Sequence, residues 1–261
     1  MTAPDQLQRA GKGALAYHRL KAQGDGSKLP GVVFLGGFRS DMTGTKAQWI
    51  ETWCRERGRA FLRFDYSGHG QSDGDFLEGC IGDWAADAAD AVEALTEGPQ
   101  ILVGSSMGGW ISLLLARRMP ERIAGLIGIA AAPDFTEDSM WAGFGAQHRE
   151  TLEEEGQVAL PSDYSDDPYI ITRRLIEDGR ENLVLRDPLA LPFPVRLLQG
   201  TADTDVEVSV ALRLIEHLDS PDARLTLVKD ADHRFSEPRE LALIGKTLHG
   251  ITRAAMGQPD G

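Results

Sequence analysis

The chain has 261 residues, of which 40 are acidic and 27 are basic, and its formal net charge at pH 7 is −13. This charge repels phosphate backbones and anionic lipid, so we expect neither nucleic acid nor an acidic membrane surface as a partner. Hydrophobic residues make up 42% of the chain, which is enough for one sizeable core. Chains of this length with α/β structure often form a single domain.

Cysteine usage and the lack of a long apolar segment bear on the cellular compartment. The two cysteines, Cys54 and Cys80, lack the spacing of a metal site and are too few for a disulfide scaffold. The longest apolar run, residues 123–132, is too short to cross a bilayer, and the N-terminus resembles neither a signal peptide nor a transit peptide. We therefore expect a soluble cytoplasmic protein without a membrane span.

Strand and helix signals alternate along the chain. Apolar runs predict strands at residues 14–20, 31–35, 60–65, 100–103, 123–132, 195–200 and 224–228. Helical spacing of apolar residues predicts helices at residues 43–57, 83–95, 110–117, 207–218 and 238–252. Such alternation predicts a mostly parallel sheet covered by helices on both faces.

The pattern changes between residues 133 and 192, where the strand signals stop. This segment carries five aromatic residues: Phe135, Trp141, Phe144, Tyr164 and Tyr169. We expect a mainly helical cap, inserted between core segments 1–132 and 193–261 and placed over the C-terminal edge of the sheet, where open α/β sheets bind ligands. The aromatic residues either line an acyl pocket or form the core of the cap, and the sequence leaves both interpretations open.

A Gly-x-Ser-x-Gly pentapeptide, Gly104 to Gly108, lies between a predicted strand and a predicted helix. At this place it predicts a nucleophile elbow, in which a strained backbone makes the Ser106 Oγ project from the end of the sheet. The two glycines permit close backbone approach. A Gly/Ser-rich loop is the alternative, but the flanking strand and helix favour the elbow. Ser105, the competing hydroxyl, should face away from the apex.

Two backbone amides are candidates for an oxyanion hole. Met107 begins the helix after the serine, so its amide points from a helix N-terminus toward the position of a developing oxyanion. Phe38 follows the glycine pair Gly36-Gly37 at the end of a buried strand, where the backbone can approach a ligand closely. An ordinary turn is the alternative for this glycine pair.

A serine hydroxyl is a poor nucleophile at neutral pH, so Ser106 needs an imidazole base and a carboxylate that orients the imidazole. Among the six histidines, only His233 lies in the loop directly after the last predicted strand, since His249 falls within the last predicted helix. His69 also lies in a loop after a strand, but its flanking glycines favour a structural turn. Asp203 is favoured as the acid over Asp205, which shares its loop. The order serine, aspartate, histidine is that of α/β hydrolases.

Four stretches carry a resemblance to a known family: LGGFRSDMTGTKA (35–47), RFDYSG (63–68), GPQILVGSSMGGW (98–110) and DHR (232–234). In these stretches the chain resembles the mitochondrial palmitoyl-protein thioesterases, also acyl-glucuronide esterases, of the α/β-hydrolase superfamily. The resemblance implies an α/β-hydrolase fold and hydrolysis of an acyl thioester or ester. It also places Ser106, Asp203 and His233 on the positions of the family's catalytic triad.

The chain departs from the family pattern at three places. Gly36-Gly37 stands where the family has Pro-Gly, His69 stands where it has a residue other than histidine, and Gln199-Gly200 stands where it has His-Gly. None of these departures touches the three candidate catalytic residues. The cap matches more loosely.

We therefore predict a serine hydrolase that cleaves acyl thioesters or carboxylic esters through an acyl-serine intermediate, without a cofactor or a metal ion. Its substrate would be a small molecule or a protein that carries an acyl group. One alternative is a carboxylesterase of small esters with no preference for long acyl chains. The other is a non-catalytic α/β-hydrolase scaffold that binds a ligand or a protein under its cap.

Overall fold

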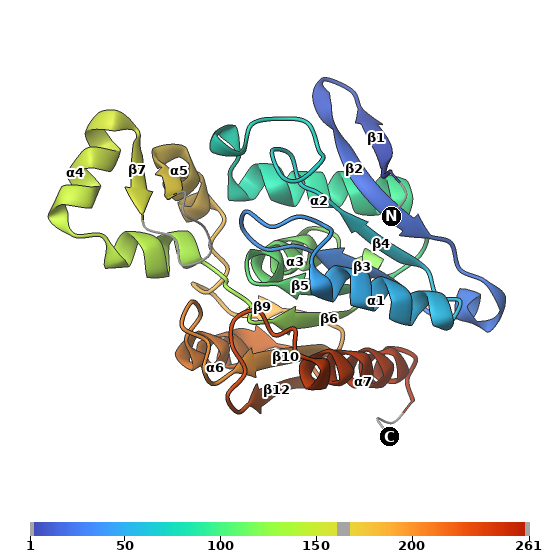
Figure 1. The fold of residues 1–261 in the computed structure, drawn as a ribbon. Coiled ribbons are helices and arrows are strands. Elements are labelled where there is room, and N and C mark those ends of the chain that lie inside the picture. Colours follow the sequence, from blue (N-terminus) through green and yellow to red (C-terminus); the bar gives the residue numbers. More distant parts are fainter. Residues whose placement is uncertain (1–2, 161–167, 259–261) are drawn as a thin grey trace.

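The computed structural model describes residues 3–160 and 168–258, which are built around a central sheet (Figure 1). Its strands are β1 (Asp5–Arg9), β2 (Lys12–Leu20), β3 (Gly31–Leu35), β4 (Phe61–Phe64), β5 (Gln100–Ser105), β6 (Ile123–Ile129), β10 (Val195–Gly200) and β12 (Ala223–Val228). The strand order is β1-β2-β4-β3-β5-β6-β10-β12. Strand β2 pairs with β1 and β4 in antiparallel fashion, and the other pairs are parallel.

Helices cover both faces of this sheet. The helices are α1 (Thr45–Glu56), α2 (Ile81–Leu95), α3 (Met107–Arg118), α6 (Val208–His217) and α7 (Pro238–Ala255). Ile50 of α1 and Leu248 of α7 belong to one buried cluster with Val32 of β3. Trp84 of α2 belongs to a second cluster with Val33, the next residue of the same strand. Because successive strand residues face opposite sides, a strand buried on both faces requires a continuous apolar run.

The predicted mostly parallel sheet with helices on both faces is confirmed. Two details differ from the prediction: the sheet has an additional edge strand, and one predicted strand is shorter. The sequence interpretation did not include β1, whose residues are largely polar because this edge strand buries little apolar surface. The strand predicted at 123–132 ends at Ile129, and Ala130 has a positive φ of 46°. The chain therefore turns away from the sheet directly after β6.

The segment between β6 and β10 contains short helices, one pair of short strands and a further short strand that pairs outside the segment. Its elements are a π-helix η4 (Thr136–Trp141), α4 (Ala146–Glu155), β7 (Gln157–Leu160), β8 (Tyr169–Thr172), α5 (Arg173–Glu181) and β9 (Leu189–Ala190). Strands β7 and β8 pair in antiparallel fashion, and β9 pairs with β11 (Leu218–Asp219). The β7–β8 pair was not predicted, since each strand has four residues and too short an alternation to give a strand signal.

Asp134 ties the beginning of this segment to its end. Its side chain is fully buried, and its two carboxylate oxygens accept hydrogen bonds from the backbone amides of Val184 (2.8 Å) and Leu185 (2.9 Å). The Arg186 guanidinium lies 3.1 Å from the same carboxylate. A buried carboxylate is stable only when its oxygens are paired in this way, so Asp134 fixes where the segment leaves and rejoins the sheet.

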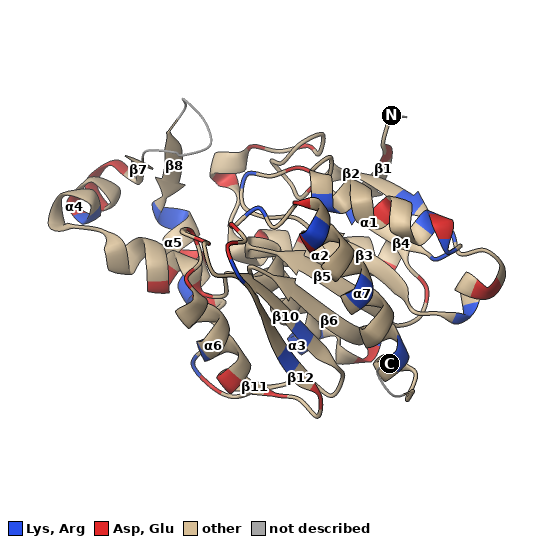
Figure 2. Cartoon of the chain, turned by 60° about the horizontal axis from the view of Figure 1, so that its bottom comes forward, with Lys and Arg blue, Asp and Glu red and all other residues tan. Residues whose placement is uncertain are grey.

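Charged residues of both signs are interspersed over the sheet helices and the inserted segment (Figure 2). Among the described residues, no helix combines the length and the apolar character that crossing a membrane requires.

Candidate active site

Ser106 occupies the corner between β5 and α3 with backbone angles of φ 54° and ψ −120°. This conformation is sparsely populated for any residue with a side chain and persists only where the surroundings enforce it. Three backbone hydrogen bonds do so. The Ser106 amide donates to the carbonyl of Ile129 (3.0 Å), and the Ser106 carbonyl accepts from the amides of Gly109 (2.8 Å) and Ala132 (3.1 Å). The turn after β6 therefore supports the strained serine.

The two glycines of the pentapeptide are required by close backbone contacts. A Cβ at Gly104 would overlap the carbonyl oxygen of Gly108, and a Cβ at Gly108 would overlap the carbonyl oxygens of Leu35 and Gly36. The corner therefore packs directly on the end of β3, as the pentapeptide predicts.

His233 lies in the loop between β12 and α7, and its two ring nitrogens face different partners. Its Nε2 is 3.1 Å from the Ser106 Oγ, and its Nδ1 is 3.1 Å and 3.0 Å from the two carboxylate oxygens of Asp203. A carboxylate can only accept, so Nδ1 carries the hydrogen and Nε2 is left to accept the serine proton. The three residues predicted from sequence, which are far apart in the chain, are thus brought together.

Asp203 is 8% exposed and receives several hydrogen bonds. One carboxylate oxygen accepts from the amides of Asp205 (3.0 Å) and Val206 (2.9 Å). Burial alone would raise the pKa of Asp203, but hydrogen bonds from His233 and Val206 and the charge of His233 hold it below its ordinary value. The carboxylate is therefore ionised at neutral pH. The rival acid, Asp205, has a carboxylate oxygen 3.9 Å from Nε2 rather than a bond to Nδ1.

One candidate oxyanion donor directly follows the serine, and the other lies in the loop after β3. Met107 is the first residue of α3, and Phe38 lies in the loop after β3. A Cβ at Gly37 would lie 3.3 Å from the Cβ of Ser106, so this loop passes close to the nucleophile. Neither amide donates a hydrogen bond to any residue that the structure describes. Neither amide is therefore committed to a partner within the described part of the chain.

Some of the aromatic residues expected in the cap surround the Phe38 ring. Its centroid lies 5.8 Å from that of Phe135 and 6.2 Å from that of Tyr169. By contrast, Trp141 and Phe144 pack on each other with centroids 6.2 Å apart. The first pair therefore packs on the ring of the oxyanion loop, and the second packs within the inserted segment. All four residues belong to or pack against one hydrophobic cluster. Tyr164 lies outside the described residues.

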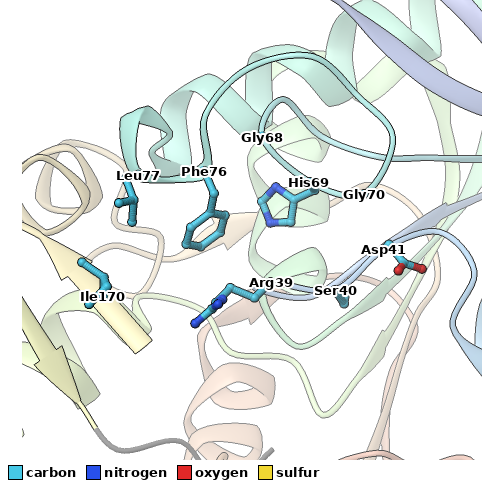
Figure 3. Close-up of a pocket in the computed structure, with 9 residues that line it drawn as sticks. All are labelled: Arg39, Ser40, Asp41, Gly68, His69, Gly70, Phe76, Leu77 and Ile170. Carbon is cyan, nitrogen blue, oxygen red and sulfur yellow. The ribbon is translucent and has the colours of Figure 1, made fainter. Parts of the chain in front are cut away.

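A cavity of about 400 Å³ opens beside the oxyanion loop (Figure 3). Phe76, Leu77 and Ile170 form its apolar end, and Ser40 and Asp41 lie toward its other end. Arg39 lies between these ends, with its guanidinium 5.8 Å from the Phe76 ring centroid. The cavity wall begins one residue after Phe38, at the edge of the sheet where the strand-end loops meet.

His69 has a structural environment, as its flanking glycines predict. The ring is 3% exposed, packs against Trp84 with centroids 5.0 Å apart, and contacts the carbonyl of Ser67 through Nδ1 (3.3 Å). Burial lowers the pKa of His69 to about 4, so the ring is neutral at physiological pH. Its partners include no carboxylate among the residues that the structure describes.

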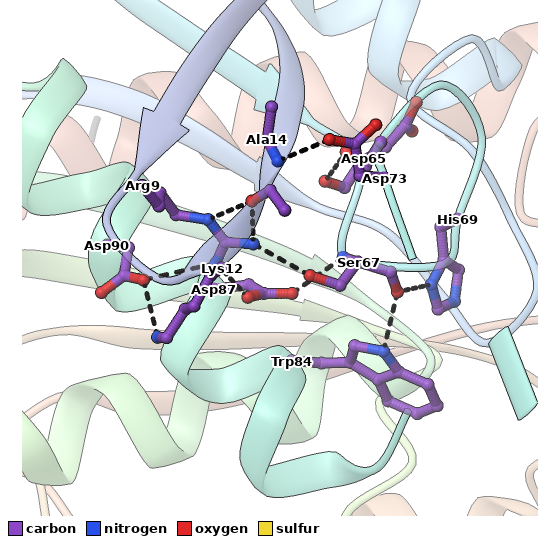
Figure 4. A network of polar contacts seen from close by, with 12 residues as sticks. Arg9, Lys12, Ala14, Asp65, Ser67, His69, Asp73, Trp84, Asp87 and Asp90 are labelled. Atoms are coloured by element: carbon purple, nitrogen blue, oxygen red, sulfur yellow. Dashed lines mark hydrogen bonds and ion pairs between the residues drawn. The ribbon is translucent and has the colours of Figure 1, made fainter. Parts of the chain in front are cut away.

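A network of polar contacts positions the loop that carries His69 (Figure 4). The Ser67 amide donates to Asp87 (2.8 Å), and the Ser67 carbonyl accepts from Trp84 Nε1 (3.2 Å) as well as from His69. Asp87 is in turn paired with the guanidinium of Arg9, which also donates to the Ser67 hydroxyl (3.0 Å). Strand β1 therefore holds this loop against α2.

Sequence reasoning assigned no role to two residues that contact the site. Gln199 of β10 donates to Asp203 (3.0 Å), and Lys46 of α1 donates to the carbonyl of Arg234, next to His233. Each contact joins two different elements of the fold, so no local spacing in the sequence predicts it. Within residues 3–160 and 168–258, no group of three or more His, Cys, Asp and Glu side chains is arranged to hold a metal ion.

Comparison with known proteins supplies the family. Residues 31–239 match the family model described as serine aminopeptidase, S33. The chain is 38% identical over 246 residues to the mitochondrial palmitoyl-protein thioesterase ABHD10 of Rattus norvegicus, and the match covers 94% of this chain and 81% of that protein.

Solved structures agree with this relationship. A putative hydrolase from Agrobacterium vitis S4 has a TM-score of 0.90 and 39% identity, covering 96% of this chain and 98% of that one. The α/β-hydrolase domain-containing protein 10 from mouse has a TM-score of 0.86 and 36% identity, covering 95% and 97%. The predicted α/β-hydrolase fold is therefore confirmed. The chain belongs to the ABHD10 family of the α/β-hydrolase superfamily and is a serine hydrolase of the esterase and thioesterase type.

Proposed function

We propose that the protein hydrolyses acyl thioesters or carboxylic esters through an acyl-serine intermediate on Ser106. The observation that carries this proposal is the chain of contacts from the Ser106 Oγ through the His233 ring to the Asp203 carboxylate, with distances of 3.1 Å and 3.0 Å. These distances are within hydrogen-bond range, so a proton can pass from the hydroxyl to the imidazole as the serine attacks.

Acylation begins when His233 removes the proton of Ser106 and the serine oxygen attacks the carbonyl carbon. Asp203 holds the imidazole in the tautomer that accepts at Nε2 and stabilises the imidazolium that forms. The amides of Phe38 and Met107 donate to the oxyanion of the tetrahedral intermediate, and losing one such donor costs about 3 kcal/mol in other enzymes. His233 then protonates the leaving thiol or alcohol as it departs.

Deacylation repeats these roles with water. His233 removes a proton from the attacking water molecule, the same two amides stabilise the second oxyanion, and His233 returns the proton to the Ser106 oxygen as the free acid leaves. The side chain is then ready for another cycle. No group outside the chain is needed for these proton transfers.

A fluorophosphonate probe tests the nucleophile. Wild-type protein should be labelled and Ser106→Ala should not, whereas Ser105→Ala is the matched control because it removes the neighbouring hydroxyl and leaves the site intact. Equal labelling of wild type and Ser106→Ala would refute the proposed function. Ligand affinity without turnover on any ester or thioester would instead support a non-catalytic scaffold.

The cavity bears on the acyl group of the substrate. The apolar end of the cavity and the aromatic residues around Phe38 support binding of an acyl chain. At about 400 Å³, however, the cavity is toward the lower end of the usual range for small-molecule pockets. This volume favours a second candidate function, a carboxylesterase of small esters. A series of thioesters and p-nitrophenyl esters of increasing acyl length separates the two, since kcat/KM should rise with length only for the long-chain thioesterase.

A further inference from the structure

Gln199, near the C-terminal end of β10, is a polar side chain in the interior of the sheet. It is 1% exposed. An amide is costly to bury unless hydrogen bonds replace its contacts with water. Its position therefore requires an explanation in terms of the groups to which it donates.

Both hydrogens of the Gln199 amide are directed at the loop that carries Asp203. Nε2 is 3.0 Å from the second carboxylate oxygen of Asp203 and 2.9 Å from the carbonyl of Val206. The opposite orientation of the amide would bring its oxygen against these two acceptors, so the surroundings fix which end faces the loop. The Gln199 oxygen has no hydrogen-bond partner among the described residues.

The donors to Asp203 are unequally divided between its two oxygens. One oxygen accepts from the amides of Asp205 and Val206, whereas the other accepts from Gln199 and shares His233. Gln199 thus donates to the carboxylate oxygen that the two loop amides do not bind. Removing it would leave one oxygen with His233 as its single partner among the described residues, and the carboxylate would be freer to rotate.

We propose that Gln199 is a positioning residue, which fixes the rotation of the Asp203 carboxylate and through it the direction in which His233 presents Nε2 to Ser106. This inference rests on the proposed function, because it assigns Gln199 to the catalytic reaction. The hydrogen bond from Gln199 is also among the contacts that keep the pKa of Asp203 below its ordinary value, against the opposing effect of burial.

The Gln199 amide also connects two segments of the chain through its contact with Val206. By donating to Asp203 and to the Val206 carbonyl at once, Gln199 joins the end of β10 to the loop that follows it. The carboxylate is therefore held by a side chain of the sheet itself. A site supported by a strand is positioned more accurately than one supported by a loop alone.

Three variants test this role. Gln199→Met has a side chain of similar length without a donor, and Gln199→His restores a ring N–H. Gln100→Met is the matched control, since Gln100 is also a buried amide at a strand end, 2% exposed, and donates to the carbonyls of Glu97 (2.8 Å) and Gly98 (3.0 Å). It begins β5 and does not contact Asp203 or His233.

The readouts are kcat and KM on a small ester and the strongly deshielded proton resonance of the His233 Nδ1–H, observed in protein labelled with ¹⁵N-histidine. We expect kcat of Gln199→Met to fall roughly 10- to 100-fold, the effect of losing one hydrogen bond to a charged group, with KM nearly unchanged. The resonance should move upfield in this variant. Gln199→His should recover part of kcat, and Gln100→Met should retain both kcat and the resonance.

Wild-type kcat and an unshifted resonance in Gln199→Met would overturn the inference, as would equal losses of kcat in Gln199→Met and Gln100→Met. If Gln199→Met does not fold, Gln199→Glu tests the inference instead. It keeps the side-chain shape but places a second carboxyl group against Asp203. Its kcat must then be below that of Gln199→His, and equal values would overturn the inference. The resonance is recorded without substrate, so it tests Gln199 even if the protein hydrolyses no ester.

Discussion

Two histidines of this protein lie in loops that follow strands of the same sheet, but their rings have different neighbours. His69, after β4, is buried among aromatic rings and contacts a backbone carbonyl. His233, after β12, lies between a carboxylate and a serine hydroxyl. Burial lowers the pKa of His69 to about 4, whereas the Nδ1 of His233 lies 3.0 Å from a carboxylate oxygen of Asp203.

The comparison shows that two histidines at strand ends of one sheet can have entirely different neighbours. The loop after β4 and helix α2 surround His69 with aromatic rings, which favour the neutral imidazole. The loop after β12 supplies an acceptor on one side of the ring and a hydroxyl donor on the other, which is what proton transfer requires. The chemistry of the neighbours decides the role, and the predictions below change those neighbours.

The largest effect should come from the partner of His233. Asp203→Asn keeps the shape of the acid but removes its charge and allows it to donate to the ring, which favours the wrong tautomer. We expect kcat to fall by about 10⁴-fold, as at the equivalent aspartate of another serine hydrolase. His69→Phe should leave kcat within a few-fold of wild type. The comparison would fail if both substitutions reduced kcat on a small ester to the same extent.

The next effect concerns the support of the loop after β4. Arg9 and Asp87 form an ion pair whose side chains are 6% and 5% exposed. Arg9→Met would leave the Asp87 carboxylate buried without its cation, so we expect the free energy of unfolding to fall by about 3–5 kcal/mol. Urea denaturation measures this change.

The exposed pair of Lys28 and Asp25 offers the control for this experiment. Its side chains are 75% and 96% exposed, so Lys28→Met should change stability by less than about 1 kcal/mol. Similar losses of stability in Arg9→Met and Lys28→Met would show that burial of the Arg9–Asp87 pair does not increase its contribution to the free energy of unfolding.

A third, slightly smaller effect follows from the lowered pKa of His69. Between pH 6.5 and pH 4 the unfolded chain binds a proton on this histidine that the folded protein does not bind, so the free energy of unfolding falls as the pH falls. At pH 4 this contribution amounts to a loss of about 3 kcal/mol relative to pH 7. His69→Phe should lack it.

Chemical denaturation of both proteins at pH 7 and pH 4 isolates this contribution, because other acidic and basic groups are common to the two. The wild type should lose about 3 kcal/mol more than His69→Phe over this interval. Parallel losses would mean that the folded and the unfolded protein bind a proton at His69 equally well, so that burial does not lower its pKa.

The sequence was sufficient to predict the sheet and the three residues that meet at its edge. Gly-x-Ser-x-Gly is a local pattern with a local physical cause, the close approach of Gly108 to the end of β3. His233 could be selected because it alone lies in the loop directly after the last strand, and Asp203 because it lies in the loop after the strand before. Their geometry agrees with that expectation, while their catalytic roles stay a prediction until the variants are measured.

Features without a local cause were not predictable in this way. Strand β1 buries so little that its residues read as a polar segment, and the β7–β8 pair is too short to show alternation. Lys46 and Gln199 support the site through contacts with other elements, at sequence separations of 188 and 4 residues. The shorter separation gave no signal either, because it joins the end of a strand to a loop whose path only the fold determines.

Lys46 provides the smallest and most specific test of the loop after β12. The residue is half-buried, and its ammonium group donates to the carbonyl of Arg234, the residue after His233. Lys46→Met leaves that carbonyl without this donor and should lower kcat by up to about tenfold, the equivalent of one hydrogen bond.

Burial lowers the pKa of Lys46 to about 8. A neutral amine still donates, however, so this contact should persist as the pH rises through 8. Lys28→Met is again the control, and an unchanged kcat in Lys46→Met would mean that β12 and α7 hold the His233 loop without help from α1.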